Sequence, residues 1–164
     1  MAQGAFFSAC LGSFYFGMRI HGSCGSRGGS GVLLIGPPGS GKSDLLLRLL
    51  DHGFALVADD QVVIENGIAR APVALAGMLE VRGLGILRLA HVHESRLELL
   101  VELAATVDRL PEPTRDAVFD LPRMRVNAWQ ASAAAIVAMA LDCALGRVLQ
   151  HAGAFTPITG VPPS

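Results

Sequence analysis

The chain contains, at residues 32–43, the sequence Val32-Leu33-Leu34-Ile35-Gly36-Pro37-Pro38-Gly39-Ser40-Gly41-Lys42-Ser43. Its first four residues predict a short apolar strand, and its last eight match the phosphate-loop pattern GxxxxGK[ST]. The leucine-rich run that follows, residues 44–50, predicts a helix. A strand, a glycine-rich loop and a helix in this order are the context that the motif requires. A glycine-rich turn that merely precedes a helix is the weaker interpretation, because lysine and serine both stand in place.

The loop is predicted to bind the phosphates of ATP together with Mg²⁺. Its glycines allow backbone N–H groups to point inward at an anion, and the helix that begins there adds its positive end. Lys42 is expected to reach the β- and γ-phosphates, and the Ser43 hydroxyl to hold Mg²⁺. The residues expected to bind the nucleotide are Gly36, Pro37, Pro38, Gly39, Ser40, Gly41, Lys42 and Ser43.

Length and composition indicate one globular domain. The chain has 164 residues, of which 51% are hydrophobic and 16% charged, with a net charge of −1. No basic stripe is present, which argues against nucleic acid as the main partner. The three cysteines, Cys10, Cys24 and Cys143, show no spacing typical of a disulfide framework or a metal site, so a reducing cytoplasm is expected.

The two ends of the chain differ from its centre. Residues 1–18 are rich in aromatic side chains, lack the basic start of a signal peptide, and are interrupted by Gly, Ser and Gln, which disfavours a membrane span. We expect a poorly ordered extension at 1–18, a catalytic domain at 19–153 and a flexible tail at 154–164. Whether the mature chain starts at Met1 or Met18 is left open.

The remaining pattern predicts an α/β fold with a mixed sheet and flanking helices. Only the first strand–helix–strand unit is expected to be parallel. Asn66-Gly67 predicts a hairpin turn, and Asn127 is a candidate cap for a long alanine-rich helix. The expected segments are a turn or loop at 22–31, a helix from the phosphate loop to about 52, strands at 54–58, 61–64, 68–75 and 97–104, an extended stretch at 79–89, a loop at 109–116, a short strand at 119–121 and the helix at 128–150.

Asp59 and Asp60 end the strand that follows the phosphate-loop helix, where an open α/β sheet places its ligand crevice. One carboxylate there can serve the metal, and the other can accept a proton from an attacking hydroxyl. Because successive residues of a strand point to opposite faces, only one of the two is expected to enter the site directly. A metal-binding aspartate with a solvated neighbour remains the alternative interpretation.

Three other residues are ambiguous by local pattern alone. Glu80 lies in an apolar stretch, where it is either a metal ligand or the partner of a nearby arginine. His21 has the pattern of a surface histidine, and Arg109 that of a solvated loop arginine.

Four strings together give a more specific signal. Ile20-His21-Gly22, the phosphate loop at 36–43, LVADD at 56–60 and LEVRGLGI at 79–86 resemble the catalytic domain of bacterial HPr kinase/phosphorylase. The order of the strings and the short spacings from His21 to the loop and from the loop to the aspartates also fit, and LVADD and LEVRGLGI are more distinctive than the loop itself. The resemblance covers roughly residues 19–150 and is closest to the short, single-domain members found in alphaproteobacteria.

The resemblance implies a fold related to phosphoenolpyruvate carboxykinase and a kinase that phosphorylates a serine of HPr, the phosphocarrier of the sugar phosphotransferase system. It also implies a reverse, phosphorylase activity that releases pyrophosphate, and a homo-oligomer, which is a hexamer in long members. The residues carried over as catalytic are His21, Lys42, Asp60 and Arg109, and those carried over for Mg²⁺ are Ser43 and Glu80, with Asp59 as a further candidate metal ligand.

One segment departs from the family pattern. Members carry Pro-Val-x-Pro-Gly-Arg-Asn before the last helix, a segment tied to the dephosphorylation step, whereas this chain has Leu121-Pro122-Arg123-Met124-Arg125-Val126-Asn127. The missing Pro-Gly leaves the phosphorylase activity open. A small-molecule kinase with an arginine-bearing lid and a nucleotide-binding regulator without transfer activity are the alternative functions.

Overall fold

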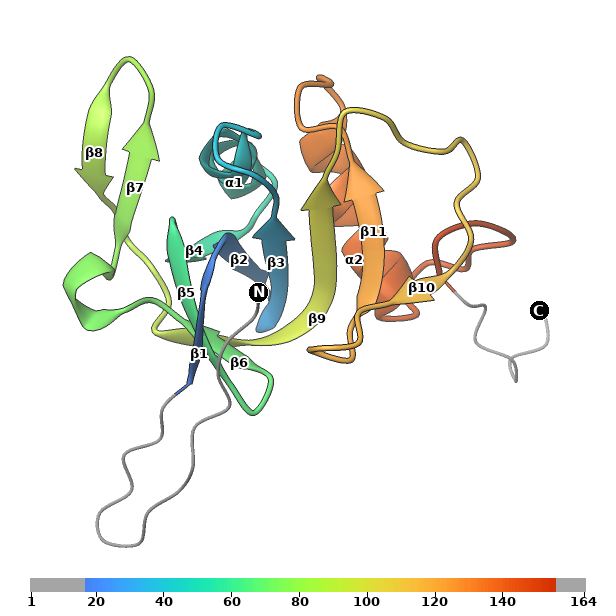
Figure 1. The fold of residues 1–164 in the computed structure, drawn as a ribbon, viewed down its shortest axis with the longest axis horizontal. Helices are drawn as coiled ribbons and strands as arrows, with labels where there is room; N and C mark the ends of the chain where they lie inside the picture. The colour runs from blue at the N-terminus through green and yellow to red at the C-terminus, as the bar shows by residue number, and fades with distance from the viewer. Residues whose placement is uncertain (1–16, 156–164) are drawn as a thin grey trace, which may run out of the picture.

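The computed structural model describes residues 17–155, and a nine-stranded mixed sheet organises them. Seven strands follow one another in the order β1-β5-β6-β9-β3-β2-β4, while β11 pairs with β9 and β10 pairs with β11 (Figure 1). The strands are β1 Met18–His21, β2 Ser23–Arg27, β3 Ser30–Ile35, β4 Ala55–Ala58, β5 Gln61–Glu65, β6 Ile68–Arg70, β9 Glu94–Leu103, β10 Thr114–Arg115 and β11 Pro122–Val126.

A separate hairpin and two helices complete the described part. The hairpin, β7 Met78–Val81 with β8 Gly85–Arg88, projects from the body beside α1. The helices are α1 Lys42–Leu50 and α2 Ala133–Ala144, with a 3-10 turn η1 at Val73–Leu75. No helix within residues 17–155 is long and apolar enough to span a bilayer.

Three parallel strands place their carboxyl ends at one edge of the sheet. β3 pairs with β9 and β9 with β11 in parallel, whereas β2 runs antiparallel between β3 and β4. The mixed sheet is therefore confirmed, although β3 and β4 are not neighbours. As predicted, β3 and β4 run parallel to each other. The prediction that they form one unit is wrong for their pairing, because β2 lies between them. The register aligns Ile35 with Glu102 and Leu103 with Val126, so the loops after all three strands emerge together.

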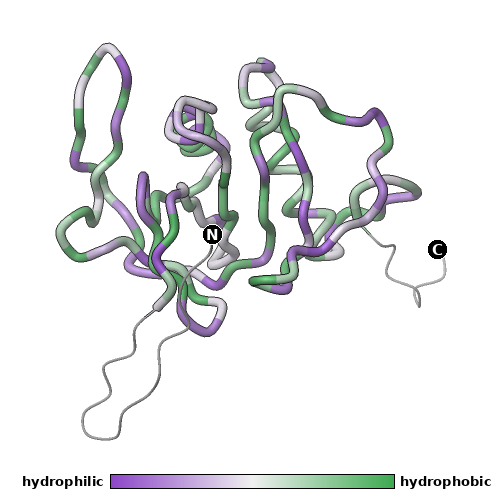
Figure 2. Tube along the Cα trace, in the orientation of Figure 1, coloured by the Kyte–Doolittle hydropathy of each residue, from purple (hydrophilic) through white to green (hydrophobic). Residues whose placement is uncertain are grey.

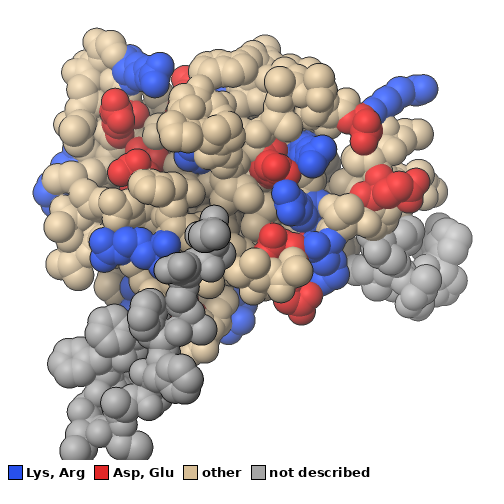
Figure 3. Space-filling view, in the orientation of Figure 1, with Lys and Arg blue, Asp and Glu red and all other residues tan. Residues whose placement is uncertain are grey.

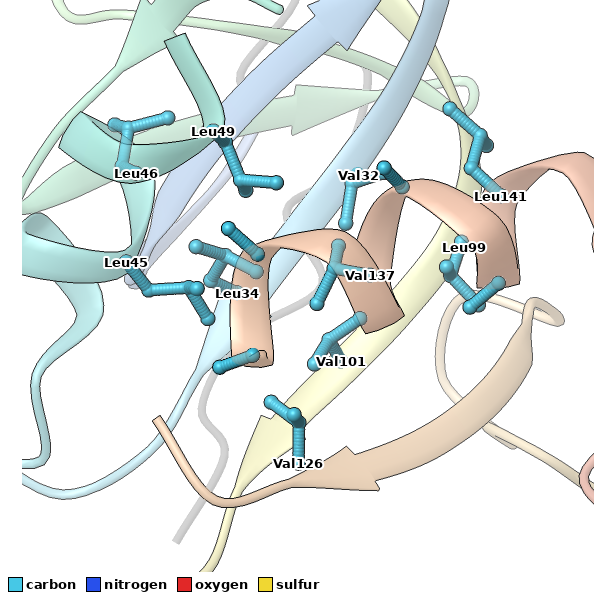
Figure 4. Close-up of a cluster of buried hydrophobic side chains, with 14 of the residues drawn as sticks. Val32, Leu34, Leu45, Leu46, Leu49, Leu99, Val101, Val126, Val137 and Leu141 are labelled. Carbon is cyan, nitrogen blue, oxygen red and sulfur yellow. The ribbon is translucent and has the colours of Figure 1, made fainter. Parts of the chain in front are cut away.

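Apolar side chains of the central strands alternate between the two faces of the sheet, and a hydrophobic core forms on each face. Val32 and Leu34 face the helices, where they pack with Leu45 of α1 and Val137 of α2, while Leu33 faces the opposite side. Figure 4 shows the helix-side cluster, with the labelled α2 side chains directed at β3 and β9. Both faces of the sheet are covered where residues 32–34 of β3 lie beside residues 99–101 of β9, and these two runs are continuously apolar and fully buried, whereas the start of β9 carries charged, exposed residues (Figure 2).

The turn or loop predicted at residues 22–31 is confirmed only at Gly28-Gly29, both at positive φ, because β2 and the start of β3 occupy most of the remainder. The glycines and serines of this segment suggest a turn, but Gly25 is needed within β2 because α1 packs closely on it. A Cβ atom at Gly25 would lie 3.1 Å from a methyl of Leu46. Close packing of a helix on the sheet therefore overrides the local turn propensity.

The helix predicted at residues 128–150 is shorter at both ends. Asn127 does cap a turn, because its side-chain oxygen accepts the Trp129 N–H at 3.0 Å, but α2 begins only at Ala133. It ends at Ala144, shortly before Gly146, which has a φ of +72°. The short strand predicted at 119–121 is also shifted, to β11 at 122–126.

Most other predicted elements hold with small changes of boundary, but the strand predicted at 68–75 is correct only for β6, which ends at Arg70, and the 3-10 turn η1 follows it. The Asn66-Gly67 hairpin is confirmed between β5 and β6, with both turn residues at positive φ. Met18, placed in the predicted extension, is the first residue of β1, and Phe155, placed in the predicted tail, is buried. Residues 1–16 and 156–164 of that extension and tail lie outside the described residues.

Candidate functional site

The phosphate loop at residues 36–43 leaves the carboxyl end of β3 and enters α1. Gly39 and Gly41 adopt φ values of +76° and +95°, which side-chain-bearing residues rarely adopt. Gly41 is the N-cap residue of α1, and no side chain caps that end within the described residues. The N–H groups of the first helical turn are thus available to an external acceptor, which fits a phosphate.

Two polar side chains of the loop support the same fit. The Lys42 ammonium group donates to the carbonyl oxygens of Gly36 at 2.8 Å and Pro37 at 3.0 Å, so it lies across the loop. The Ser40 hydroxyl is buried and has no hydrogen-bond partner among residues 17–155. An ammonium group, an unsatisfied hydroxyl and open N–H groups together form a donor set suited to phosphate oxygens.

Asp59 connects the phosphate loop to the rest of the site. Its side chain is 5% exposed and accepts hydrogen bonds from the Ser43 hydroxyl at 2.8 and 2.9 Å and from the Ser23 hydroxyl at 2.7 Å. The Glu80 backbone N–H contacts the same carboxylate at 3.3 Å. Asp59 therefore joins α1, β2 and β7 at the end of β4.

Asp60, unlike the buried Asp59, faces solvent. Its side chain is exposed, and its backbone has a φ of +66°, a left-handed conformation that aspartate tolerates better than most residues. A tight turn creates this change of direction, because the Gln61 N–H donates to the Asp59 carbonyl at 2.7 Å. The pair is thus divided into one enclosed and one accessible carboxylate, as expected, although a turn and not strand alternation separates them.

His21 lies at the end of β1 beside this turn. It is paired with Gln61 in the β1–β5 register, and the following Gly22 N–H donates to the Asp60 carbonyl at 3.1 Å. The His21 side chain is exposed. The structure therefore brings His21 and Asp60 to neighbouring positions at the rim of the site.

The predicted metal residues are only partly assembled. Ser43 and Asp59 are in contact, whereas Glu80 touches Asp59 through its backbone and its own side chain is exposed. Within residues 17–155 no group of three or more His, Cys, Asp and Glu side chains could hold a metal by itself. Mg²⁺ bound to a nucleotide needs only one or two protein oxygens, since phosphates and water supply the rest. The Ser43–Asp59 pair fits that requirement.

Arg109 lies apart from the phosphate loop. It belongs to the connection between β9 and β10, which swings away from α1 on the far side of β11 in Figure 1. There it lines a pocket together with residues of α2 and of the segment 150–155. The structure does not bring Arg109 into contact with the other predicted catalytic residues.

Sequence reasoning missed two residues near the loop. Ser23 is fully buried and binds Asp59, and its place two residues after His21 on the extended chain could have indicated it. Trp129 lies beside Gly41 of the phosphate loop, where a Cβ atom would be 3.4 Å from its ring, and no sequence signal points to it.

Figure 3 shows basic and acidic groups interleaved on the face that it displays. One such cluster joins Glu102 of β9 to Arg123 at 2.6 Å and Arg125 at 3.2 Å on β11. The Arg123 guanidinium, through its hydrogen bond, lowers the pKa of Glu102 despite the opposing effect of burial.

Comparison with known proteins shows which family the chain belongs to. The family model described as "HPr Serine kinase C-terminal domain" matches residues 15–144. The chain belongs to this family. Its fold is similar to the solved "Structure of the Hpr(Ser) kinase/phosphatase from Coxiella burnetii", with a TM-score of 0.67 over 79% of this chain and 97% of that one, at 22% identity.

Curated relatives agree with this membership. The HPr kinase/phosphorylase of Malacoplasma penetrans is 38% identical over 95 residues, which cover 51% of this chain and 32% of that protein. The HPr kinase/phosphorylase of Bordetella petrii is 37% identical over 123 residues, covering 66% of this chain and 40% of that protein. The chain thus spans well under half the length of these curated relatives.

Proposed function

We propose that this chain is an ATP-dependent protein-serine kinase that phosphorylates the phosphocarrier protein HPr. Family membership and the relatives' names support this substrate. The observation that carries the proposal is the contact between Ser43 of the phosphate loop and Asp59, because it sets Asp60 beside the nucleotide site. A fold of the phosphoenolpyruvate-carboxykinase-like type and a cytoplasmic location accompany the proposal, as the family resemblance implies.

The phosphate loop, residues 36–43, is proposed to hold the phosphates of ATP. The open N–H groups of α1 and the Lys42 ammonium would contact phosphate oxygens, and Lys42 would exchange its two loop carbonyls for them. Ser43 and Asp59 would hold Mg²⁺, with Glu80 of the adjoining hairpin as a further candidate ligand. When bound, Mg²⁺ supplies positive charge that neutralises the phosphates.

Asp60 is proposed as the group that accepts the serine proton. The Asp59 carboxylate is enclosed and occupied by three donors, whereas the Asp60 side chain is accessible to a protein substrate. His21, at the neighbouring position, would contact the transferred phosphoryl group. Arg109 is proposed as catalytic from its Val-Asp-Arg-Leu context alone. Because Arg109 lies apart from the phosphate loop, this role requires the connection at residues 104–113 to move toward the loop.

The reverse, phosphorylase reaction is proposed at the same site. An oxygen of inorganic phosphate attacks the phosphoserine phosphorus, the bond to the serine oxygen breaks, and pyrophosphate leaves while Asp60 returns a proton to that oxygen. Arg123 and Arg125, the arginines of the divergent segment, are both paired with Glu102 rather than free. Because these arginines are paired and the Pro-Gly is missing, the phosphorylase step is tested separately from the kinase step.

The test combines the protein with HPr, radiolabelled ATP and Mg²⁺, and then adds inorganic phosphate to the phosphorylated product. We expect label on HPr, none on an HPr variant whose acceptor serine is replaced by alanine, and release of labelled pyrophosphate after phosphate is added. Absence of label on HPr under every condition would overturn the kinase. Phosphorylation without pyrophosphate release would remove only the phosphorylase.

A further inference from the structure

Trp129 is an aromatic side chain placed directly against the phosphate loop. A Cβ atom on Gly41 would lie 3.4 Å from two atoms of the six-membered ring of its indole. The side chain is nevertheless 65% exposed, so much of its surface is not covered by the described residues. A large apolar ring beside a loop of polar donors is not accounted for by packing.

The backbone around Trp129 is fixed on both sides. The Arg48 guanidinium of α1 donates to the carbonyl oxygens of Ala128 and, at 3.2 Å, Gln130. Asn127 accepts the Trp129 N–H at 3.0 Å and donates to the Ala105 carbonyl at 3.3 Å. These bonds fix the backbone that carries the indole beside the loop, while the side chain itself stays exposed.

The position also follows from the topology. Trp129 lies three residues after the carboxyl end of β11, and the phosphate loop follows the carboxyl end of the parallel strand β3. In sheets of this kind, ligands bind at the edge where parallel strands end. Trp129 is therefore at the ligand edge, on the side of the loop where α1 and the segment 127–130 meet.

We propose that Trp129 stacks on the purine base of the bound nucleotide. This inference rests on the proposed function, because it assumes that the phosphates occupy the loop. The indole supplies a flat apolar face and the loop supplies the phosphate donors, so the two parts together match a nucleoside triphosphate. A surface of the substrate protein is the competing partner, but the position of the ring beside Gly41, within the phosphate loop, favours the nucleotide.

The test compares binding of Mg·ATP with binding of Mg·tripolyphosphate, which lacks a base, by calorimetry. The variants are Trp129→Ala, Trp129→Phe and the control Leu149→Ala, whose side chain is also 65% exposed. Base–aromatic stacking is worth about 1–3 kcal/mol, so we expect Trp129→Ala to weaken ATP binding about ten-fold. Tripolyphosphate binding should be unchanged, Trp129→Phe should restore most of the ATP affinity, and Leu149→Ala should match wild type.

A second readout uses the wild-type chain, since Trp129 is its only tryptophan. ATP should change the fluorescence of the indole, and tripolyphosphate should change it much less. An unchanged ATP affinity in Trp129→Ala would overturn the stacking and leave the kinase proposal intact. An equal loss for both ligands would also overturn it, because Trp129 would then act through the shape of the loop. If wild type binds neither ligand, the proposed function fails as well.

Discussion

The Ser43 hydroxyl lies within 2.8 and 2.9 Å of the two carboxylate oxygens of Asp59, sixteen residues further along the chain. This contact fastens the first turn of α1 to the end of β4. Ser23 approaches the same carboxylate from β2. Asp59 thus has one serine partner in the phosphate loop and one outside it, which allows their roles to be separated.

Replacing Ser43 by alanine should weaken ATP binding at least ten-fold when Mg²⁺ is present and change it little when Mg²⁺ is chelated, because a metal ligand is lost. Ser23→Ala is the matched control. It removes a fully buried donor from the same carboxylate and should lower the free energy of unfolding by about 1–2 kcal/mol, with nucleotide affinity kept. Calorimetric titrations and urea unfolding measure both. A similar loss of Mg²⁺-dependent affinity in the two variants would contradict the assignment.

Asp60→Asn should reduce phosphoryl transfer to HPr by about 10²–10⁴-fold, the usual contribution of a general base. Asparagine tolerates the left-handed backbone of this residue, which has a φ of +66°, so the fold should be retained. ATP affinity should stay within about two-fold of wild type, because the side chain is exposed and is not in the loop. Initial rates and equilibrium binding test this, and loss of nucleotide binding would indicate a metal-binding role instead.

Arg123→Ala should destabilise the protein at neutral pH and much less at acid pH. The lowered pKa of Glu102 means that its ionised form is favoured by folding. This stabilisation is present above the ordinary value of 4.5 and is lost as pH falls through the lowered, folded-state pKa. We expect a difference of about 1 kcal/mol at pH 7, measured by urea unfolding at pH 7 and pH 3.

Glu102→Gln supplies the control for that experiment, since it removes the titrating group but keeps a similar shape. In this background Arg123→Ala should have the same effect at both pH values. A pH dependence that survives the substitution would show that another carboxyl group is responsible, and Asp116, 3.8 Å from Arg123, would be the next to replace.

Cys24 should resist alkylation in the folded protein. It is fully buried in β2, and burial raises the pKa of its thiol to about 12, so very little reactive thiolate exists at pH 8. Cys143 is partly exposed and serves as the internal comparison, although burial and then Asp142 raise its pKa as well. Peptide mass spectrometry after iodoacetamide treatment should find Cys24 modified only in denaturant. Rapid labelling of Cys24 in the native protein would contradict the burial.

Sequence reasoning succeeded where the signal is local. The phosphate loop, the start of α1 and the Asn66-Gly67 turn depend on the backbone freedom of a few adjacent residues, and all three lie where they were predicted. It failed in β2, where Ser23, Gly25 and Ser26 have the composition of a turn. Gly25 leaves room for Leu46 of α1, while Ser23 bonds Asp59 and Ser26 bonds Ser95, and none of these contacts is visible in the local pattern.

The sequence by itself determined that a phosphate loop follows a strand, that two aspartates end a later strand, and that only one of them would face inward. Those expectations come from motif spacing and from the alternation of extended chain. Only the tertiary structure decided which aspartate is enclosed, because that depends on Ser23 and Ser43 arriving from β2 and α1. It also placed Trp129 against Gly41 and Arg109 away from the loop, since residues far apart in the chain meet only through the pairing of β3, β9 and β11.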